Sequence, residues 1–244
     1  MRNPCVAHRG WSGLAPENTL AAIQMAIDEP NVDWVEIDVQ LSKDSVPFVI
    51  HDFKLRRTTN GKGEVRDKMA VELASLDAGN WFSHKYRGEP LPTLDSVLHA
   101  AADRCCLNIE LKTDGIRYPH LEERVLDRIH AHGLENNVIL TSFHPGALNN
   151  VLKLSEGRVR TGLIVDRWRD SLPEELRQTK SDLLSIAYSK LNKERVQKLK
   201  QNNIQIMAWT LNDERSIRKI AALDPEIMIC TNYPDRWRKA IAKL

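Results

Sequence analysis

Short β-rich apolar runs alternate with longer segments of helical period along most of this chain, and that alternation limits the folds open to it. Eight runs are candidate parallel strands, and a helix or a long connection follows each of them. The chain has 244 residues, so one unit averages about 30 residues, the usual length of a βα unit. Eight such units predict an α/β fold, the (β/α)₈ TIM barrel. The candidate strands are residues 4–9, 33–40, 105–112, 137–143, 159–166, 182–189, 204–212 and 226–232.

The alternation lapses between about residues 53 and 92. This stretch is polar and rich in Gly, Lys and Arg, and it follows an extra apolar run at residues 46–50. We interpret residues 53–92 as a small insertion in the barrel after the early strands. No linker or low-complexity segment divides the chain, so we expect residues 1–244 to form a single domain. A doubly wound open sheet is the alternative fold, and it is disfavoured because no G-x-G-x-x-G motif follows the first strand.

Composition and charge argue against several classes of partner. The formal net charge is +2, so we expect neither a nucleic acid nor a strongly charged membrane surface as partner. The N-terminal residues lack the apolar core of a signal peptide, and no apolar run reaches the roughly 18 to 20 residues of a membrane span. Cys5, Cys105, Cys106 and Cys230 form no C-x-x-C pair, and we interpret them as reduced thiols. Together these features predict a cytoplasmic protein without membrane insertion.

Two carboxylates interrupt the apolar strand "WVEIDVQ". Glu36 and Asp38 are two residues apart, so their side chains point to the same side of the strand, and Glu110 and Lys112 do the same on a later strand. In a barrel, residues near the C-terminal strand ends surround the open mouth. Three carboxylates that met there would repel one another unless a cation joined them. Oxygen ligands of this kind favour one hard divalent cation, either Mg²⁺ or Ca²⁺.

Two histidines and two cations fall at strand ends of the same predicted barrel. His8 and Arg9 end the first strand, His51 follows the extra apolar run, and Lys112 ends the strand of Glu110. Near pH 7 an imidazole can accept a proton from an attacking oxygen or donate one to a leaving oxygen. Arg9 and Lys112 can neutralise a phosphate. The combination predicts metal-assisted phosphoryl transfer.

Simpler interpretations exist for each pattern taken alone. Glu-x-Asp on a strand is commonly a solvated face, and Glu110 with Lys112 could be an ion pair of little energetic value. A single histidine at a strand end is more often structural than catalytic. The functional interpretation is favoured because three carboxylates, two histidines and two cations all fall at strand ends of one barrel.

Five motifs, in this order, resemble those of glycerophosphodiester phosphodiesterases of the cytoplasmic bacterial type. They are "AHRG…PENTLAAI", "EIDVQLSKDSVPFVIHD", "RTTNGKG", "IELK" and "AWTLN", and together they span nearly the whole chain. The resemblance implies a barrel with an inserted segment after the early strands. It also implies that His8 is the general base, that His51 is the general acid, and that the metal ligands are Glu36, Asp38 and Glu110.

The resemblance extends to residues around these positions. Arg9 matches a phosphate-binding residue, Lys112 one near phosphate or metal, and Trp209 an aromatic side chain that packs on the glycerol. Glu17 is interpreted either as a partner of a cation such as Arg9 or as a first-turn helix residue. Asn232 departs from the family, in which an Asp often follows the last strand, and we assign it no catalytic role.

One further histidine stands near a strand end. His144 follows the candidate strand at residues 137–143. We interpret it as a rim or structural residue.

The resemblance implies hydrolysis of a small-molecule glycerophosphodiester, such as glycerophosphocholine or glycerophosphoethanolamine, to sn-glycerol 3-phosphate and an alcohol. It also implies that the glycerol 2-hydroxyl attacks first and that water then opens a cyclic phosphate. Two alternatives are a phospholipase C-like or sphingomyelinase D-like barrel and a non-enzymatic glycerophosphodiester-binding module. The preferred alcohol, the choice of Mg²⁺ or Ca²⁺ and the oligomeric state stay open.

Overall fold

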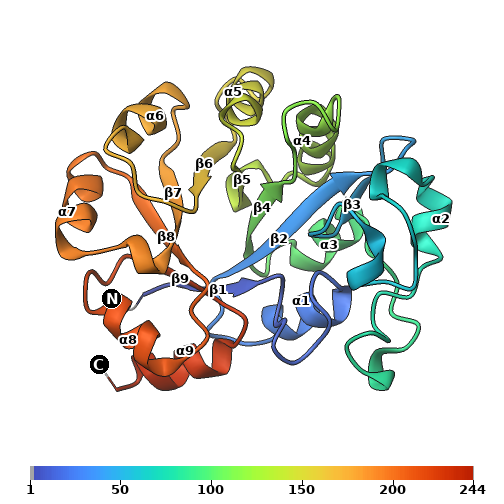
Figure 1. Cartoon of the computed structure of the whole chain (residues 1–244), viewed down its shortest axis with the longest axis horizontal. Coiled ribbons are helices and arrows are strands. Elements are labelled where there is room, and N and C mark those ends of the chain that lie inside the picture. Colours follow the sequence, from blue (N-terminus) through green and yellow to red (C-terminus); the bar gives the residue numbers. More distant parts are fainter. Residues whose placement is uncertain (1–2, 244) are drawn as a thin grey trace.

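Eight parallel strands form a closed ring in the computed structural model, which describes residues 3–243 (Figure 1). Neighbours around the ring follow the order β1-β9-β8-β7-β6-β5-β4-β2, and pairing of β1 with β2 closes it. The predicted TIM barrel is confirmed, and the open doubly wound sheet is excluded. The strands are β1 (Cys5–His8), β2 (Trp34–Leu41), β4 (Cys106–Leu111), β5 (Val138–Ser142), β6 (Arg160–Val165), β7 (Leu183–Ala187), β8 (Gln205–Trp209) and β9 (Met228–Thr231).

Helices surround the strand ring and cover its outer face (Figure 1). Several begin at a residue whose side chain accepts a backbone hydrogen bond, as Thr93, Asn192 and Asp213 do, which satisfies N–H groups that the helix leaves unpaired. Trp237 is buried in the layer between helices and strands. The helices are α1 (Leu20–Ile27), α3 (Leu94–Ala101), α4 (Leu121–His132), α5 (Pro145–Leu154), α6 (Leu172–Gln178), α7 (Lys193–Gln201), α8 (Glu214–Ala221) and α9 (Pro234–Ile241).

The segment between β2 and α3 differs from the repeating units. Strand β3 (Pro47–Val49) pairs antiparallel with β2, and short helical turns follow it. The segment packs a small apolar cluster of its own that includes Phe48, Leu55 and Leu73. These short elements are η1 (Leu55–Arg57), η2 (Val65–Asp67), α2 (Ala70–Ala74) and η3 (His84–Tyr86).

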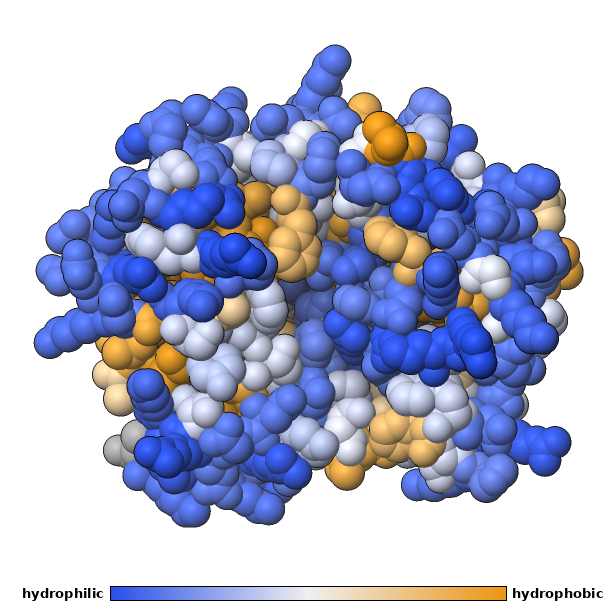
Figure 2. Space-filling view, in the orientation of Figure 1, coloured by the Kyte–Doolittle hydropathy of each residue, from blue (hydrophilic) through white to orange (hydrophobic). Residues whose placement is uncertain are grey.

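Alternation along β2 explains the carboxylates in its sequence. Val35, Ile37 and Val39 are fully buried and belong to the cluster that also includes residues of α3 and α4. Glu36 and Asp38 point to the opposite side, into the barrel, because successive side chains of a strand alternate. The face shown in Figure 2 is mostly hydrophilic and is hollowed near the middle of the ring. Within residues 3–243, every helix is too short or too polar to cross a lipid bilayer.

Candidate active site

The three predicted metal ligands meet at the C-terminal end of the barrel. Asp38 and Glu110 are register partners on the neighbouring strands β2 and β4. Glu36, Asp38 and Glu110 each offer a carboxylate oxygen, and these three atoms lie within 4.8 Å of one another. Glu36 and Asp38 are buried, and Glu110 is half-buried. The strand geometry thus brings together the acidic side chains that the sequence pattern singled out.

Burial makes this cluster of carboxylates electrostatically unfavourable without a cation. Burial, and then the charge of Asp38, raise the pKa of Glu36 well above its ordinary value and the pKa of Glu110 to about 7. Burial also opposes ionisation of Asp38, but Arg9 and then Lys112 outweigh it and hold the pKa of Asp38 below its ordinary value. Asp38 Oδ1 is buried and has no hydrogen-bond partner among the described residues. A donor set of carboxylate oxygens with one such atom fits a hard divalent cation.

Two cationic side chains border the carboxylates. The Arg9 backbone N–H donates to Glu36 Oε2 at 2.9 Å, and the side-chain Nε of Arg9 lies 3.2 Å from Asp38 Oδ2. Lys112 Nζ donates to Glu110 Oε1 at 2.8 Å and lies 3.7 Å from Asp38 Oδ1. An anionic ligand at the cluster would therefore meet positive charge from two strands.

A sharp turn after β1 places Arg9. Its φ is +57° and that of Gly10 is +76°, a region that favours glycine. A Cβ on Gly10 would lie 2.6 Å from the backbone carbon of Ala22 in α1, so this turn has no space for a side chain. Glu17 precedes α1 and accepts a hydrogen bond from Arg9 Nη1 at 2.8 Å. The interpretation of Glu17 as a partner of Arg9 is therefore favoured.

His8 lies beside the carboxylates with one ring nitrogen held by an amide. Nδ1 lies 2.7 Å from Asn232 Oδ1, and Nε2 lies 3.8 Å from Glu36 Oε2. Because the amide oxygen can only accept, Nδ1 carries the proton and Nε2 has the lone pair. Burial, and then Arg9, lower the pKa of His8 to about 4. His8 is therefore neutral near pH 7, with the lone pair of Nε2 on the side of the carboxylates.

His51 follows β3 and belongs to a chain of ion pairs. Its Nδ1 lies 2.7 Å from Asp52 Oδ1, and Asp52 accepts two hydrogen bonds from Arg57 at 2.6 and 2.9 Å. Arg57 in turn donates to Glu17, the partner of Arg9. The contact with Asp52 fixes the ring and leaves Nε2 as the nitrogen free to exchange a proton with a ligand.

A cavity of about 150 Å³ opens between the two histidines. Trp209, at the end of β8, and Phe143, just after β5, stand edge to face on its rim, with ring centroids 6.3 Å apart. The lining therefore combines polar and charged side chains with two aromatic rings. The full lining is His8, Arg9, Glu36, His51, Asn108, Glu110, Phe143, Ile164, Ser185, Met207, Trp209, Thr210 and Cys230.

Comparison with known proteins agrees with this geometry. The sequence profile of the glycerophosphoryl diester phosphodiesterase family matches residues 8–236. The chain belongs to this family. A glycerophosphodiester phosphodiesterase from Caldanaerobacter subterraneus is 35% identical over 243 residues, which cover 94% of this chain and 97% of that protein. One from Bacillus altitudinis is 36% identical over 238 residues, with 94% of each chain covered.

A solved structure extends the comparison to a bound product. A phosphodiesterase from Oleispira antarctica, in complex with the product sn-glycerol 3-phosphate, superposes with a TM-score of 0.87 and 31% identity. The superposition covers 99% of this chain and 97% of that one. The two chains thus share the same barrel over nearly all of their lengths.

Several contacts of this family member were not evident from its sequence. The sequence indicates no catalytic role for Asn232, yet its side-chain amide holds His8, and Asn212 in turn accepts a hydrogen bond from the Asn232 backbone N–H at 2.9 Å. Phe143 was not singled out beside Trp209. The signal for both was their position directly after a barrel strand. His144 does not line the cavity, and its backbone N–H donates to Ser142 Oγ, which agrees with the rim or structural role expected for it.

Proposed function

We propose that this chain hydrolyses glycerophosphodiesters to sn-glycerol 3-phosphate and an alcohol, using two histidines and one divalent cation, Mg²⁺ or Ca²⁺. The observation that carries the proposal is the meeting of Glu36, Asp38 and Glu110 beside His8 and His51 at the barrel mouth. Membership of the family supports the reaction, and the Oleispira antarctica relative was solved with this product.

The phosphate would lie over the three carboxylates, which would hold the cation. When bound, the cation supplies positive charge that stabilises the phosphoryl oxygens as negative charge develops on them. Arg9 lies on one side of the cluster and Lys112 on the other. The guanidinium and the ammonium neutralise the phosphate and orient it. Glu17 keeps the Arg9 side chain in place through its hydrogen bond.

His8 and His51 move the protons. The lone pair of His8 Nε2 takes the proton of the attacking glycerol 2-hydroxyl while its oxygen forms a bond to phosphorus. His51 Nε2 gives a proton to the alcohol oxygen as the bond between that oxygen and phosphorus breaks. In the second step the histidines exchange roles. His51 takes a proton from water as the water oxygen forms a bond to phosphorus, and His8 returns a proton to the 2-oxygen as the bond between that oxygen and phosphorus breaks. Both histidines end in their starting protonation states.

The aromatic residues of the cavity accept the glycerol. Trp209 and Phe143 offer ring surface on which the carbon chain of glycerol packs, while its hydroxyl groups meet polar side chains of the lining. The small volume of the cavity, about 150 Å³, suits a glycerol unit and not an acyl chain. This supports a preference for deacylated diesters over intact phospholipids.

A substrate and metal panel tests the proposal. The purified protein is treated with EDTA, supplied with Mg²⁺ or Ca²⁺, and assayed for glycerol 3-phosphate release from glycerophosphocholine, glycerophosphoethanolamine and intact phospholipid in vesicles. We expect release from the glycerophosphodiesters that EDTA abolishes and one of the metals restores. Release of a phosphorylated alcohol, or a preference for vesicles, would favour the phospholipase-like alternatives. Full activity after thorough chelation would remove the metal from the proposal.

The proposal includes a single barrel domain that acts in the cytoplasm. Cys5 and Cys230 support this location, because both are buried in the barrel as small apolar side chains, the usual state of reduced cysteines. Fractionation of producing bacterial cells tests it. Activity recovered outside the cytoplasmic fraction would contradict it.

A further inference from the structure

A second pocket adjoins the catalytic cavity and shares His51 with it. This outer pocket has a volume of about 430 Å³ and is open to solvent. His51 lines both spaces, so a ligand in one meets a ligand in the other at this imidazole. The lining of the outer pocket is His51, Asp52, Phe53, Lys54, Glu64, Lys112 and Arg117.

The walls of the outer pocket are held by contacts between the inserted segment and the loop after β4. The Arg117 guanidinium stacks on Phe53, 4.1 Å from the ring centroid, and donates to Glu64 at 2.7 Å. Lys54 and Glu64 are partners in an antiparallel backbone bridge. The stacking and the bridge position these side chains before any ligand arrives.

The charges of the outer pocket are paired except for one. Asp52 is bound by Arg57, and Glu64 is bound by Arg117 and also by Arg66, whose Nε lies 2.8 Å away. Both acidic side chains are thus neutralised, and Glu64 contacts two cations. Lys112 is paired with Glu110. Lys54 is exposed, and its ammonium has no ion pair with any residue that the structure describes. The unbalanced charge of the pocket is therefore positive.

We propose that the outer pocket binds the departing alcohol and that Lys54 selects alcohols bearing a carboxylate or a phosphate over those bearing a quaternary ammonium. The inference rests on the proposed function. In that reaction His51 protonates the alcohol oxygen, while the glycerol fills the inner cavity. The alcohol therefore extends past His51 into the space on its other side. A cationic group in that space is repelled by Lys54, and the carboxylates of Asp52 and Glu64 are already paired with arginines.

Three synthetic substrates separate charge from shape. Each joins sn-glycerol 3-phosphate to one alcohol: choline, its uncharged isostere 3,3-dimethylbutanol, or the anionic 4-hydroxybutanoate. We expect kcat/KM to rise in that order for the wild type at low ionic strength. The preference should shrink as salt is added, because salt screens exposed charges.

The esters also differ in the intrinsic reactivity of their alcohols. Comparing a charge-reversal variant at Lys54 with the wild type on the same esters cancels that difference. The ratio of kcat/KM for the 4-hydroxybutanoate ester to that for the choline ester should fall about fivefold or more in Lys54→Glu, and by less in Lys54→Gln. Lys198→Glu is the matched control. It makes the same change in net charge on the outer helix α7 and should leave the ratio unchanged.

Each outcome bears on a distinct claim. An unchanged ratio in Lys54→Glu, with all three esters hydrolysed, would overturn the assignment of the pocket and leave the proposed function standing. An equal fall in Lys198→Glu would show an effect of net charge alone and would overturn the role of Lys54. If the wild type hydrolysed none of the esters in the presence of either metal, the proposed function and this inference would fall together.

Discussion

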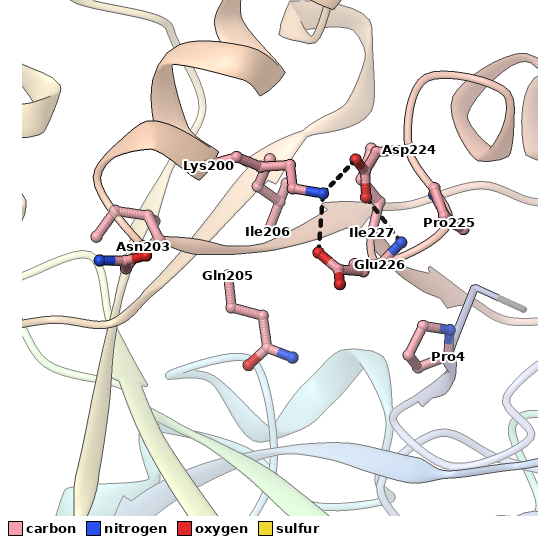
Figure 3. A pocket seen from close by; sticks show the side chains of 10 residues that line it. Pro4, Lys200, Asn203, Gln205, Ile206, Asp224, Pro225, Glu226 and Ile227 are labelled. Atoms are coloured by element: carbon pink, nitrogen blue, oxygen red, sulfur yellow. Dashed lines mark hydrogen bonds and ion pairs between the residues drawn. The ribbon is translucent and has the colours of Figure 1, made fainter. Parts of the chain in front are cut away.

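The two ends of the barrel carry cavities of opposite character. The cavity at the N-terminal end has a volume of about 610 Å³, larger than the 150 Å³ of the cavity at the C-terminal end. It is lined by residues that precede or begin strands, among them Pro4, Gln205 and Ile227. Its charged side chains pair with one another, because Lys200 Nζ lies 2.6 Å from Asp224 Oδ2 and 2.9 Å from Glu226 Oε2 (Figure 3).

The comparison teaches that volume alone does not mark a functional site. At the N-terminal end, exposed charges pair with each other and need no ligand. At the C-terminal end, the carboxylates of Glu36 and Asp38 are buried, and Asp38 Oδ1 has no hydrogen-bond partner among residues 3–243. Buried charge with incomplete pairing is costly for folding. A binding role accounts for why this chain tolerates three converging carboxylates at the C-terminal end.

The largest effect is expected from removing a buried carboxylate. Asp38→Asn should lower the rate by about 10³-fold or more, because the cation that it would hold stabilises charge in the transition state. The matched change at the other end, Asp224→Asn, should alter the rate by no more than about twofold. Steady-state kinetics on glycerophosphocholine measures both. Comparable losses in the two variants would break the contrast between the ends.

The next effect concerns proton transfer. His8→Ala and His51→Ala should each reduce kcat on the order of 10²-fold or more, because each removes a proton carrier from the cavity. His132→Ala is the control, since that histidine ends α4 and pairs with Asp95 outside the cavity. Wild-type kcat in either of the first two variants would contradict the two-histidine mechanism.

A smaller effect is expected at Asn232, which contacts His8 but does not line the cavity. Asn232→Ala should lower kcat about tenfold with KM little changed, because it frees the ring and its tautomer. Asn232→Asp keeps an accepting oxygen and should retain more activity. If KM rose and kcat stayed constant, Asn232 would be a substrate contact and not a positioning residue for His8.

The smallest effect is expected at the N-terminal cavity. Lys200→Gln breaks two exposed ion pairs, which contribute little to stability, and should leave kcat/KM within about twofold of the wild type. The assay is the one used for Asp38→Asn. A tenfold fall in kcat/KM would show that this end of the barrel also serves the reaction.

The sequence predicted the barrel because its signals are local. The strand expected at residues 33–40 is Trp34–Leu41, and that expected at 105–112 is Cys106–Leu111. The same period-two pattern predicted that Glu36 and Asp38 face the barrel interior.

Contacts between distant segments could not be predicted in this way. Asn232 reaches His8 only because β9 pairs with β1 when the ring closes. The stacking of Arg117 on Phe53 joins two loops whose paths no periodicity specifies. The network from His51 through Asp52 and Arg57 likewise depends on the fold of the inserted segment. The reactive groups were therefore predictable, whereas the residues that hold them required the structure.

Calorimetric titration of Mg²⁺ and Ca²⁺ into chelator-treated protein tests the central claim most directly. The wild type and Glu226→Gln should each bind one ion of at least one of these metals per chain. Glu110→Gln should bind it at least tenfold more weakly, because it removes one of the three converging carboxylates. Undiminished affinity in Glu110→Gln, or a wild type that binds neither ion and still turns over substrate, would contradict the account.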